Sequence, residues 1–580
     1  MKSIKILALC AVLVAVMPMQ AQVPPQIDYG FGGAVLNRDM MWAPDLAELS
    51  RTHVFGTSRV MGMGGAFVSL GADLTSMSLN PAGLGMYRRS EFSLTPLVPM
   101  SSASTKGAPS WVGNNKTSFA FSNIGVALNV LERSSGALTS LTIGLGMNRI
   151  ADYNTRYSYS SESLYDPASG AYMPTIADIF SQQLNSWGTR PNSSNSLPIP
   201  EMHPSVWLPA LGYDGYMVGY FPGGDNPNNP WGVERIGGNA SVLHSMDVVN
   251  RGSVNEFDIS LGGNINNIVY FGATFGIQSI YKRTGVTYQE EYGYFNTGGV
   301  AQTWNGSAQQ WEDLPEQIEK MNVFQQTVVE GSGVNFKVGV VVRPTTGLRL
   351  GVAFHTPTYY SLDYSYRADL FADVVKNINK PDEEGRRVGN DTPTARNEGP
   401  DNWNLTSPAR LMFGASYTFG NFAIVSVDYE RDWYNGIRVK NIPQGNYLSR
   451  EDYKREFKRN FQGTNSIRAG FEIKPLPILA LRVGGGYTDS MLKDRNSYVY
   501  DANSSLPSTY ESYYFSAGLG VTLSRSVTLD FAYQNLTDKL TQYQLFFSRD
   551  FVTGDLKTWS GTYDTSLTRH YISMTFGFRF

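Results

Sequence analysis

The residues best suited to catalysis or metal binding are few and scattered along this chain of 580 residues. No two histidines stand at the i,i+4 spacing that brings two metal ligands onto one face of a helix. They are His53, His203, His244, His355 and His570. The single cysteine, Cys10, lies near the N-terminus, so the rest of the chain can form neither a disulfide nor a thiolate metal site. We therefore expect no metal and no cofactor.

The glycine-rich run at residues 61–66 is the nearest approach to a nucleotide-binding motif. Gly62, Gly64 and Gly65 do not form a dinucleotide fingerprint, because Phe67 replaces the last glycine and no strand–helix frame surrounds the run. The chain also lacks a Walker loop, an HExxH pair and the GxSxG motif of hydrolases. We expect no enzyme.

The composition is that of a large β-protein rather than of a helical membrane protein. Charged residues make up 17% of the chain, against roughly 25% in a typical soluble domain. Aromatic residues reach 13%, glycine accounts for 58 residues, and the mean hydropathy is only −0.25. A transmembrane barrel needs such a mixture, although a large secreted sandwich or propeller shares it. The net charge of −3, with scattered Lys and Arg, gives no sign of nucleic-acid binding.

The first 21 residues have the pattern of a cleaved signal peptide. Lys2 and Lys5 precede an apolar run at residues 6–17 that is too short to span a bilayer of about 30 Å. Ala21 is a suitable residue before the cleavage site. Cys10 follows Leu9, where a lipidation site requires a small residue, so we do not expect a lipoprotein. The chain is therefore expected to be exported.

Strict alternation of apolar and polar residues predicts membrane-spanning strands. No second apolar run approaches 18 residues, and in lipid only helices and closed barrels satisfy every backbone group. The last strand is the clearest, since Ile572, Met574, Phe576, Phe578 and Phe580 share one face. A final strand that ends on an aromatic residue resembles the insertion signal of outer-membrane barrels, which would assign that role to Phe576, Phe578 and Phe580.

Fourteen such strands can be counted, and the connections between them alternate between short and long. The strand centres are near residues 94, 124, 143, 258, 275, 335, 354, 412, 428, 468, 482, 518, 532 and 574, with a bulge near Asn123. Outer-membrane barrels have short periplasmic turns and long outer loops, and a soluble sandwich has no reason to sort its connections in this way. We predict a transmembrane antiparallel barrel over residues 91–580, with both termini periplasmic.

The longest outer connection spans residues 151–253 and contains one predicted helix at residues 174–187. A loop of this length is usually functional or disordered. The connections near residues 367–405 and 436–462 carry mixed charge. We interpret them as solvated outer surface, with contact to cations or lipopolysaccharide as the alternative.

Residues 22–90 do not alternate and are rich in small, turn-forming residues. A barrel of about fourteen strands has a lumen wider than wall side chains can fill, so a compact N-terminal segment is well placed to plug it. Asn80 precedes Pro81 and is therefore disfavoured in the helical region, which predicts a sharp bend. We expect a hatch over residues 22–90.

The order of several short motifs resembles the FadL/TodX (OMPP1) family of outer-membrane transporters, in the form common in Bacteroidetes. These motifs are the run at residues 61–66, the Asn-Pro-Ala-Gly sequence at residues 80–83, and strand motifs such as those at 348–351 and 529–533. The resemblance implies fourteen strands and passive uptake of hydrophobic molecules, typically long-chain fatty acids or aromatic compounds. It also implies a hatch formed by Asn80, Pro81, Ala82 and Gly83, with Gly62, Gly64 and Gly65 nearby. The ligand would move through an apolar pocket and leave beside a kinked third strand, where Gly144 and Gly146 permit a kink.

Two functions from different classes follow from this resemblance. The leading hypothesis is a hydrophobic-ligand channel that lies in the outer membrane as a monomer and meets outer-membrane lipids, lipopolysaccharide and the barrel-assembly machinery. The alternative is a barrel component of a Bacteroidetes secretion system, a scaffold or shuttle that transports nothing. A polar porin is disfavoured by the plug.

Overall fold

The computed structural model describes most of the chain outside its N-terminus and parts of its outer connections. The described residues are 29–31, 41, 43–106, 115–133, 136–163, 175–199, 202, 206–223, 227–234, 236, 241–293, 302–305, 310–313, 316–376, 386–389, 395–396, 401–443, 449–493, 511–543, 546–549, 556–558 and 563–580. The expected signal peptide at residues 1–21 and His203 lie outside them.

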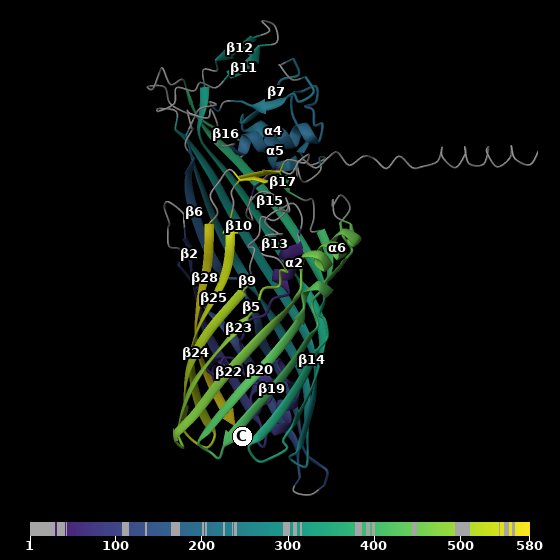
Figure 1. Ribbon diagram of the computed structural model, residues 1–580, viewed down its shortest axis with the longest axis vertical. Helices are drawn as coiled ribbons and strands as arrows, with labels where there is room; N and C mark the ends of the chain where they lie inside the picture. The colour runs from purple at the N-terminus through teal and green to yellow at the C-terminus, as the bar shows by residue number, and fades with distance from the viewer. Residues whose placement is uncertain are drawn as a thin grey trace, which may run out of the picture.

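The strands close into one antiparallel barrel with fourteen strands around its wall, as predicted (Figure 1); each of these fourteen positions in the wall is called a stave below. The hydrogen-bonded order around the wall is β2, β4, β5, β9, β10, β13, β14, β19, β20, β22, β23, β24, β25 and β28, and β28 pairs again with β2. Several staves continue outward in a second strand, as β5 does in β6 and β14 in β15. Every predicted strand centre lies within a wall strand, so the predicted count and positions are confirmed.

The wall strands are β2 (Glu91–Lys106), β3 (Asn115–Thr117), β4 (Ala120–Glu132), β5 (Leu138–Asp152), β6 (Thr155–Ser163), β9 (Ser241–Ile265), β10 (Val269–Gly293), β13 (Glu316–Val342), β14 (Leu348–His355), β15 (Tyr359–Lys376), β16 (Arg386–Gly389), β17 (Ala395–Arg396), β18 (Asp401–Thr406), β19 (Arg410–Phe419), β20 (Ala423–Trp433), β21 (Arg438–Lys440), β22 (Gly463–Leu476), β23 (Leu479–Thr488), β24 (Glu511–Thr522), β25 (Val527–Tyr543) and β28 (Tyr563–Arg579). Smaller sheets pair β7 (Val218–Tyr220) with β8 (Trp231–Val233), β11 (Gln302–Asn305) with β12 (Gln310–Asp313), and β1 (Tyr29–Phe31) with β26 (Phe546–Arg549), which also pairs with β27 (Leu556–Thr558).

Local chemistry explains the tight turns at one end of the barrel and the irregularity in β4. The β9–β10 turn is made by Asn266 and Asn267, both with positive φ, which asparagine tolerates better than most residues. In the β2–β4 ladder, Thr95 pairs with Asn123 whereas Pro96 pairs with Phe121, so Ser122 is the extra residue of a bulge. This confirms the bulge predicted near Asn123.

An apolar belt surrounds the end of the barrel where the short turns lie. Outward residues of every stave are large and exposed there, among them Phe257, Ile277, Phe336 and Val427. Phe576, Phe578 and Phe580 belong to this surface, and their role in insertion stays a prediction. A closed barrel with an outward apolar belt is the architecture of outer-membrane proteins. Within the described residues, no helix is long and apolar enough to cross a membrane.

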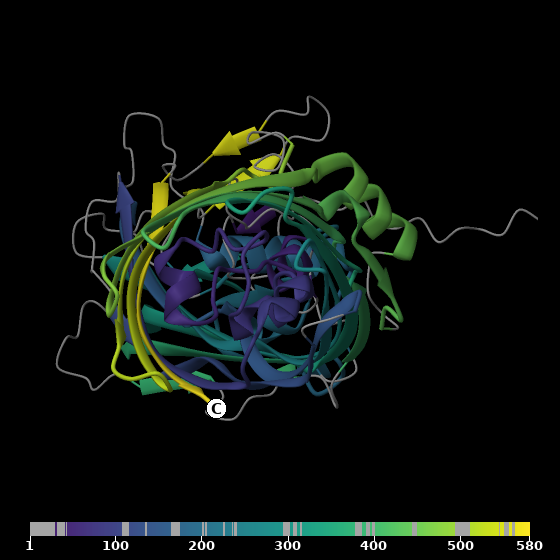
Figure 2. The same ribbon diagram turned by 90° about the horizontal axis from the view of Figure 1, so that it is seen from below.

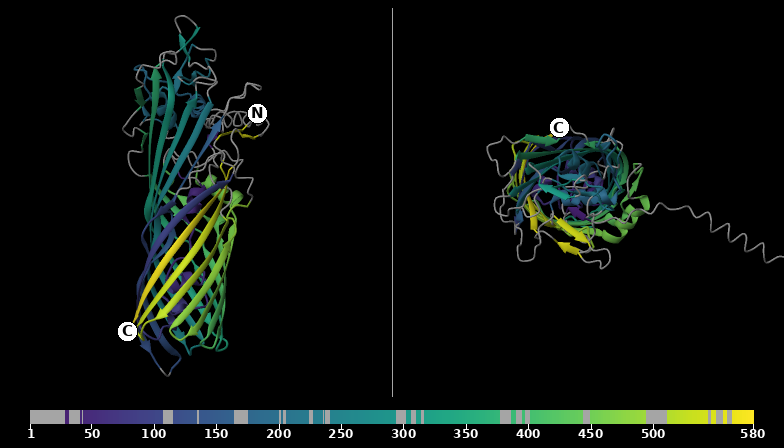
Figure 3. Two further views of the ribbon diagram at one scale, coloured as in Figure 1. Left: turned by 90° about the vertical axis from the view of Figure 1, so that its left-hand side faces the viewer. Right: turned by 90° about the horizontal axis from the view of Figure 1, so that it is seen from above.

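The long outer connections differ from the expected loops, because strands continue into them. β9, β10 and β13 have 25, 25 and 27 residues, about twice the length that crosses a bilayer. Together with β15 they form a tall curved sheet above the belt (Figure 3, left), and this sheet with the segments packed on its inner face is called the outer tube below. Much of residues 151–253 is therefore strand and helix, namely β6, α4 (Ile176–Ser186), α5 (Trp207–Asp214) and the start of β9. α4 confirms the predicted helix, and its N-terminus is fixed by a capping box between Thr175 and Asp178.

The N-terminal segment runs from the outer end of the molecule down through the lumen. β1 pairs with β26, which lies in the outer connection between β25 and β28. The expectation that both termini are periplasmic is therefore wrong for the first described residues of the N-terminal segment, because β1 lies at the outer end of the barrel. Four short helices follow: α2 (Ala43–Leu49), α3 (Ser58–Gly62), η1 (Leu74–Met77) and η2 (Pro81–Met86). Seen from below, they occupy the interior of the ring of strands (Figure 2).

The outer rim also carries two elements that the sequence pattern did not reveal. They are η6 (Tyr434–Gly436) and α6 (Arg450–Asn460), which contact each other. α6 lies outside the wall in Figures 1 and 2, and its Tyr453 hydroxyl donates a hydrogen bond of 2.6 Å to the Met41 carbonyl of the N-terminal segment.

Candidate functional site

The Asn-Pro-Ala-Gly sequence forms a capped turn in the centre of the plug, by which we mean residues 43–90. Asn80 is the N-cap of η2: its Oδ1 accepts a hydrogen bond from the Ala82 amide at 3.1 Å, and its Nδ2 donates to the Val68 carbonyl at 2.7 Å. Pro81 takes the first helical position, where its missing N–H costs nothing. The Ala72 amide donates to the Gly83 carbonyl at 3.0 Å, so the motif also closes on the preceding turn.

The two glycine-containing motifs of the plug rest against opposite sides of the barrel. The first sits on β9, β10 and β13: a methyl group added at Gly339 would lie 1.8 Å from Asn80 Oδ1, and one at Gly272 would lie 2.3 Å from the Pro81 backbone. The second, Gly62, Gly64 and Gly65, lies on the side of β22–β24, where Gly62 and Gly64 contact the backbone at Gly518 and Gly485. Lumen-facing glycines therefore form a seat into which the plug backbone fits.

Wall side chains also bind the plug backbone by hydrogen bonds. They come from eight strands around the barrel: Ser122 and Asn129 of β4, Ser140 of β5, Thr274 of β10, His355 of β14, Arg410 of β19, Asp428 of β20, Tyr514 and Ser516 of β24, and Thr575 of β28. The Asp428 carboxylate, for example, accepts from the Val68 amide at 2.8 Å. The plug is thus held all round, and the lumen is filled at the level of the apolar belt.

Gly144 and Gly146 of β5, the third strand around the wall, also leave room for the plug. Methyl groups there would lie 2.6 Å from the Sδ and Cε atoms of Met77, respectively. β5 keeps its pairing with β4 and β9 through both glycines, and its irregularities in the β9 ladder occur at Thr139 and Ile150 instead. Whether the third strand bends at these glycines stays a prediction.

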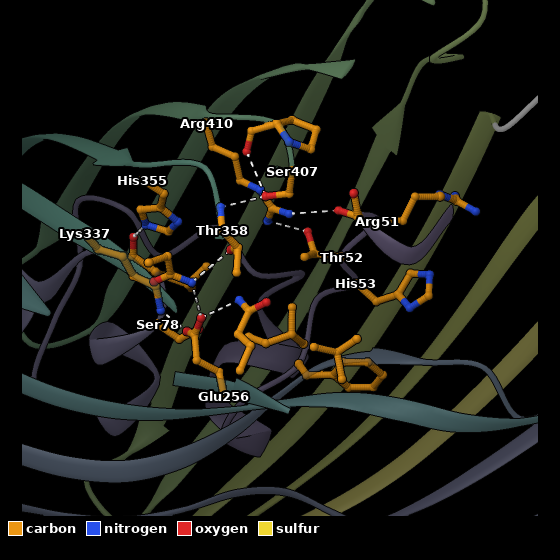
Figure 4. Close-up of a pocket in the computed structure, with 18 of the residues that line it drawn as sticks. Arg51, Thr52, His53, Ser78, Glu256, Lys337, His355, Thr358, Ser407 and Arg410 are labelled. Atoms are coloured by element: carbon orange, nitrogen blue, oxygen red, sulfur yellow. Dashed lines mark hydrogen bonds and ion pairs between the residues drawn. The ribbon is translucent and has the colours of Figure 1, made fainter. Parts of the chain in front are cut away.

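A cavity of about 70 Å³ lies on the outer side of the plug (Figure 4). Its floor is made by plug residues 49–55, 75, 78 and 79, and its walls by β5, β9, β10, β13, β14, β15, β19, β20 and β22. At roughly 10–15 Å³ per water, it has room for about five water molecules or a small polar group. The resemblance implied an apolar pocket, whereas this lining is mixed: it includes several charged side chains, because wall residues that face the lumen at this level are polar.

An ion-pair cluster forms one side of this cavity. The Lys337 ammonium contacts Glu256 and lies 2.9 Å from Asp258, all three side chains being buried. Asp258 also accepts from Asn148 at 2.9 Å, and Glu256 from Asn335 at 2.8 Å. Two carboxylates therefore share one ammonium and are completed by amide donors, as buried charges require.

Two arginines and an unpaired histidine form the other side. Arg410 lies 3.3 Å from Asp432, and Arg468 lies 2.6 Å from Glu430. Neither ring nitrogen of His53 has a hydrogen-bond partner among the described residues, although both are shielded from solvent. Burial, with a smaller contribution from the Arg569 guanidinium, lowers the pKa of His53 to about 3, so the ring is neutral at physiological pH. The cavity can hold a small polar group, and His53 can donate to it or accept from it.

Above the cavity, the interior of the outer tube is apolar. One continuous cluster joins α2, α4 and α5 to the inward faces of β9, β10, β13 and β15. Its largest buried members include Phe180, Trp207, Tyr288 and Trp403. A tube of strands outside the membrane is thus packed with apolar side chains.

The wall beside the cavity has a seam where the ladder is incomplete. β5 pairs with β4 only as far as Asn148, and the bulge at Ile150 follows. Further outward, β3 and β6 approach each other, and the described residues show no ladder between them. Arg149 lies across the seam, since its Nε donates to the Phe121 carbonyl at 3.3 Å. The His53 amide of the plug donates to the Ile150 carbonyl at 2.9 Å, so the plug touches the seam directly.

The sequence motifs located the plug but not the cavity residues. The charged wall residues of the cavity, such as Lys337 and Arg468, are isolated charges on the polar faces of strands, and that is the signal that could have found them. The structure also brings His53 and His355 into one cavity although they are distant in sequence. Among the described residues, no three His, Cys, Asp or Glu side chains are grouped so as to hold a metal ion.

Fold and site together define a transmembrane barrel of the outer-membrane type with a plugged lumen. No protein family model matches the chain, and no curated protein does. Solved structures to which it is similar include a Pseudomonas aeruginosa FadL homologue (12% identity, 91% of this chain and 99% of that chain, TM-score 0.48). The P. putida toluene transporter TodX (10%, 92% and 99%, 0.46) and the monoaromatic hydrocarbon channel CymD (13%, 91% and 97%, 0.44) are others. Two of them, the FadL homologue and TodX, bear the names of the family that the sequence motifs resemble.

Proposed function

We propose that this protein is an outer-membrane channel for the passive uptake of hydrophobic molecules, with the plug as a hatch that closes the lumen. The observation that carries the proposal is the apolar interior of the outer tube, where α4 and α5 pack against the inward faces of the long strands. Water-filled porins have a polar lumen, so an apolar interior at the outer entrance favours apolar cargo. Each methylene that moves from water into such an interior gains about 0.8 kcal/mol.

The seam beside the cavity supports a lateral exit rather than passage through the plug. The plug is bound to the wall by hydrogen bonds from eight strands, so moving it as a body would break many contacts at once. Arg149 and Ile150 line the cavity and also belong to the seam. Opening this point requires that Arg149 leave the Phe121 carbonyl, that the plug release Ile150, and that the Lys116 ammonium of β3 leave the Asn250 carbonyl of β9. An apolar molecule would then pass into the membrane without crossing water.

Equilibrium binding of a fluorescent long-chain fatty acid to the detergent-purified barrel tests this proposal. We expect saturable micromolar binding to the unaltered protein, with affinity changed in Asn80→Ala, because that substitution removes the cap of η2 and both side-chain bonds to the plug. Ser361→Ala, an exposed change on β15, serves as the matched control and should bind as the unaltered protein does.

Absence of binding across a panel of fatty acids and aromatic hydrocarbons would contradict the channel. Co-purification of a protein in stoichiometric amount, together with that absence, would instead support the secretion-scaffold alternative. High ion conductance of the unaltered barrel in a planar bilayer would contradict the closed hatch.

A further inference from the structure

A second pocket opens at the periplasmic end of the barrel, on the opposite side of the plug from the cavity. Its volume is about 380 Å³. Plug residues Arg59, Ala72 and 86–89 form one wall, and the ends of β2, β22–β25 and β28 form the other. Both the end of the plug and the end of β28 line this pocket, so the site exists only in the closed barrel.

The pocket carries an excess of positive charge. Six cationic side chains line it: Arg59, Arg88, Arg89, Lys474, Arg482 and Arg579. The carboxylates in contact with them are four, Glu91, Glu132, Glu472 and Asp530, which leaves two cations in excess.

Two side chains, Arg89 and Lys474, account for this excess of positive charge. The Arg89 guanidinium is exposed and bonds only the Arg525 carbonyl, at 3.3 Å, among the described residues. Lys474 is 44% exposed and lies 3.8 Å from Glu472, a carboxylate that Arg482 already holds at 2.6 Å. Two cations therefore remain available to an anion that enters the pocket.

A buried hydroxyl supplies an independent sign of a ligand. Tyr87 is 3% exposed, lines the pocket, and its hydroxyl has no hydrogen-bond partner among the described residues. Tyr87 lies within electrostatic range of the carboxylates Glu91 and Asp73 and of the guanidinium groups of Arg579 and Arg59, and of these four Glu91, Arg579 and Arg59 line the same pocket. Because an unpaired buried hydroxyl costs free energy, a donor left in this position is best explained by an acceptor that the pocket receives.

The rim of the pocket is apolar on the side of the membrane. Pro477, Ile478 and Leu479 line it, and Ile478 and the adjacent Leu476 are more than half exposed at the β22–β23 turn. This turn lies at the periplasmic end of the apolar belt, where the phospholipid head groups of the inner leaflet are. An anionic head group attached to acyl chains matches a cationic pocket with an apolar rim.

We propose that the periplasmic pocket binds a phosphate group, and that its source is the head group of an anionic phospholipid of the periplasmic leaflet. Arg89 and Lys474 contact the phosphate oxygens, the Tyr87 hydroxyl donates to one of them, and the acyl chains run along Ile478. The site lies below the plug and is independent of the uptake proposed above.

Native mass spectrometry of the detergent-purified barrel with added phosphatidylglycerol tests the site. The test variant is Arg89→Gln with Lys474→Gln, since neither change leaves a buried carboxylate unpaired. Its control, Arg450→Gln with Lys458→Gln on exposed α6, removes the same charge at the outer end. We expect one retained lipid per barrel, at least tenfold weaker retention in the test variant, weaker retention in Tyr87→Phe, and no change in the control.

Competition with inorganic phosphate separates the two sources. Displacement of the lipid only by a large excess of phosphate supports the head group. Inorganic phosphate that binds with the same dependence on Arg89 and Lys474, without lipid retention, overturns the lipid source and leaves a soluble phosphate as ligand. Equal retention in all variants indicates non-specific lipid and overturns the site, as does failure of both probes to bind. Heat-modifiable migration on gels confirms that each variant is folded.

Discussion

The long strands of this barrel run through both its membrane-embedded half and its outer half. In the membrane-embedded half their outward face is apolar and their inward face polar, and in the outer half this arrangement is reversed. In β10, Ile277 faces the lipid and Gln278 faces the lumen. Tyr281 is the last large exposed apolar residue of this strand. Beyond it the pattern reverses, since Thr287 is exposed and Tyr288 is completely buried. A strand's alternation is thus constant, whereas the polarity of each face follows the medium that it meets.

The two halves are consequently held together by different forces. The lower half has a lumen of hydrogen bonds and ion pairs between the plug and the wall, such as the Asp428 bond to the Val68 amide. The upper half has an apolar core like that of a soluble protein, with α4 and α5 inside a tube of strands. The same substitution should therefore have opposite consequences in the two halves, and three predictions use this difference.

A carboxylate placed inside the outer tube should have the largest effect. Leu362 of β15 is completely buried, and its register partners are Gly331 and Trp403. We expect Leu362→Asp to lower the free energy of unfolding on the order of 5 kcal/mol, from lost apolar burial and an unpaired buried carboxyl group. Ser361→Asp, on the exposed face of the same strand, should change it by less than about 0.5 kcal/mol. Urea unfolding followed by tryptophan fluorescence measures both, and equal values would contradict an apolar core.

Much of this outer tube was visible in the sequence and was nevertheless assigned to loops. Residues 359–370 alternate as cleanly as any membrane strand, with Tyr360, Leu362 and Tyr364 on one face and Ser361 and Asp363 on the other. The predicted strand centres place this segment in an outer connection, although its alternation continues that of the preceding strand. The number and order of strands were predictable because alternation is local, whereas the height of the tube depends on which medium surrounds each segment.

A lysine on the lipid-facing surface should have the next largest effect. Ile277 is 40% exposed, and its register partners Phe257 and Val334 are exposed and apolar as well. We expect Ile277→Lys to reduce the stability of the barrel in lipid by about 2–4 kcal/mol, as for lysine near a bilayer midplane. Thr287→Lys, on the outward face of the same strand above the belt, should be nearly neutral. Equal unfolding midpoints of both variants in lipid vesicles would show that the belt is misplaced.

The plug was predictable from sequence and the cavity above it was not, for a physical reason. The plug motif at residues 80–83 is contiguous, and its turn is dictated by Asn80 and Pro81 themselves. The cavity gathers Lys337, His53 and Arg410 from separate segments, and their meeting depends on register and shear of the closed wall. A single sequence shows the charge on each strand but not the level at which two strands meet.

The smallest expected effect concerns the glycine seat, which distinguishes the two halves at the level of one methyl group. In the lower half, a methyl group at Gly339 would lie 1.8 Å from Asn80 Oδ1, so Gly339→Ala should displace the plug and cost about 1–3 kcal/mol by overpacking. In the outer half, the nearest atom to such a methyl group at Gly285 is 3.7 Å away, so Gly285→Ala should be close to neutral. Faster proteolysis of the plug in the first variant alone is the expected result.

If the clash is the cause, Asn80→Ala combined with Gly339→Ala should be no worse than Asn80→Ala alone, since the shared contact makes the two changes non-additive. Fully additive effects would place the strain in the wall rather than at the plug.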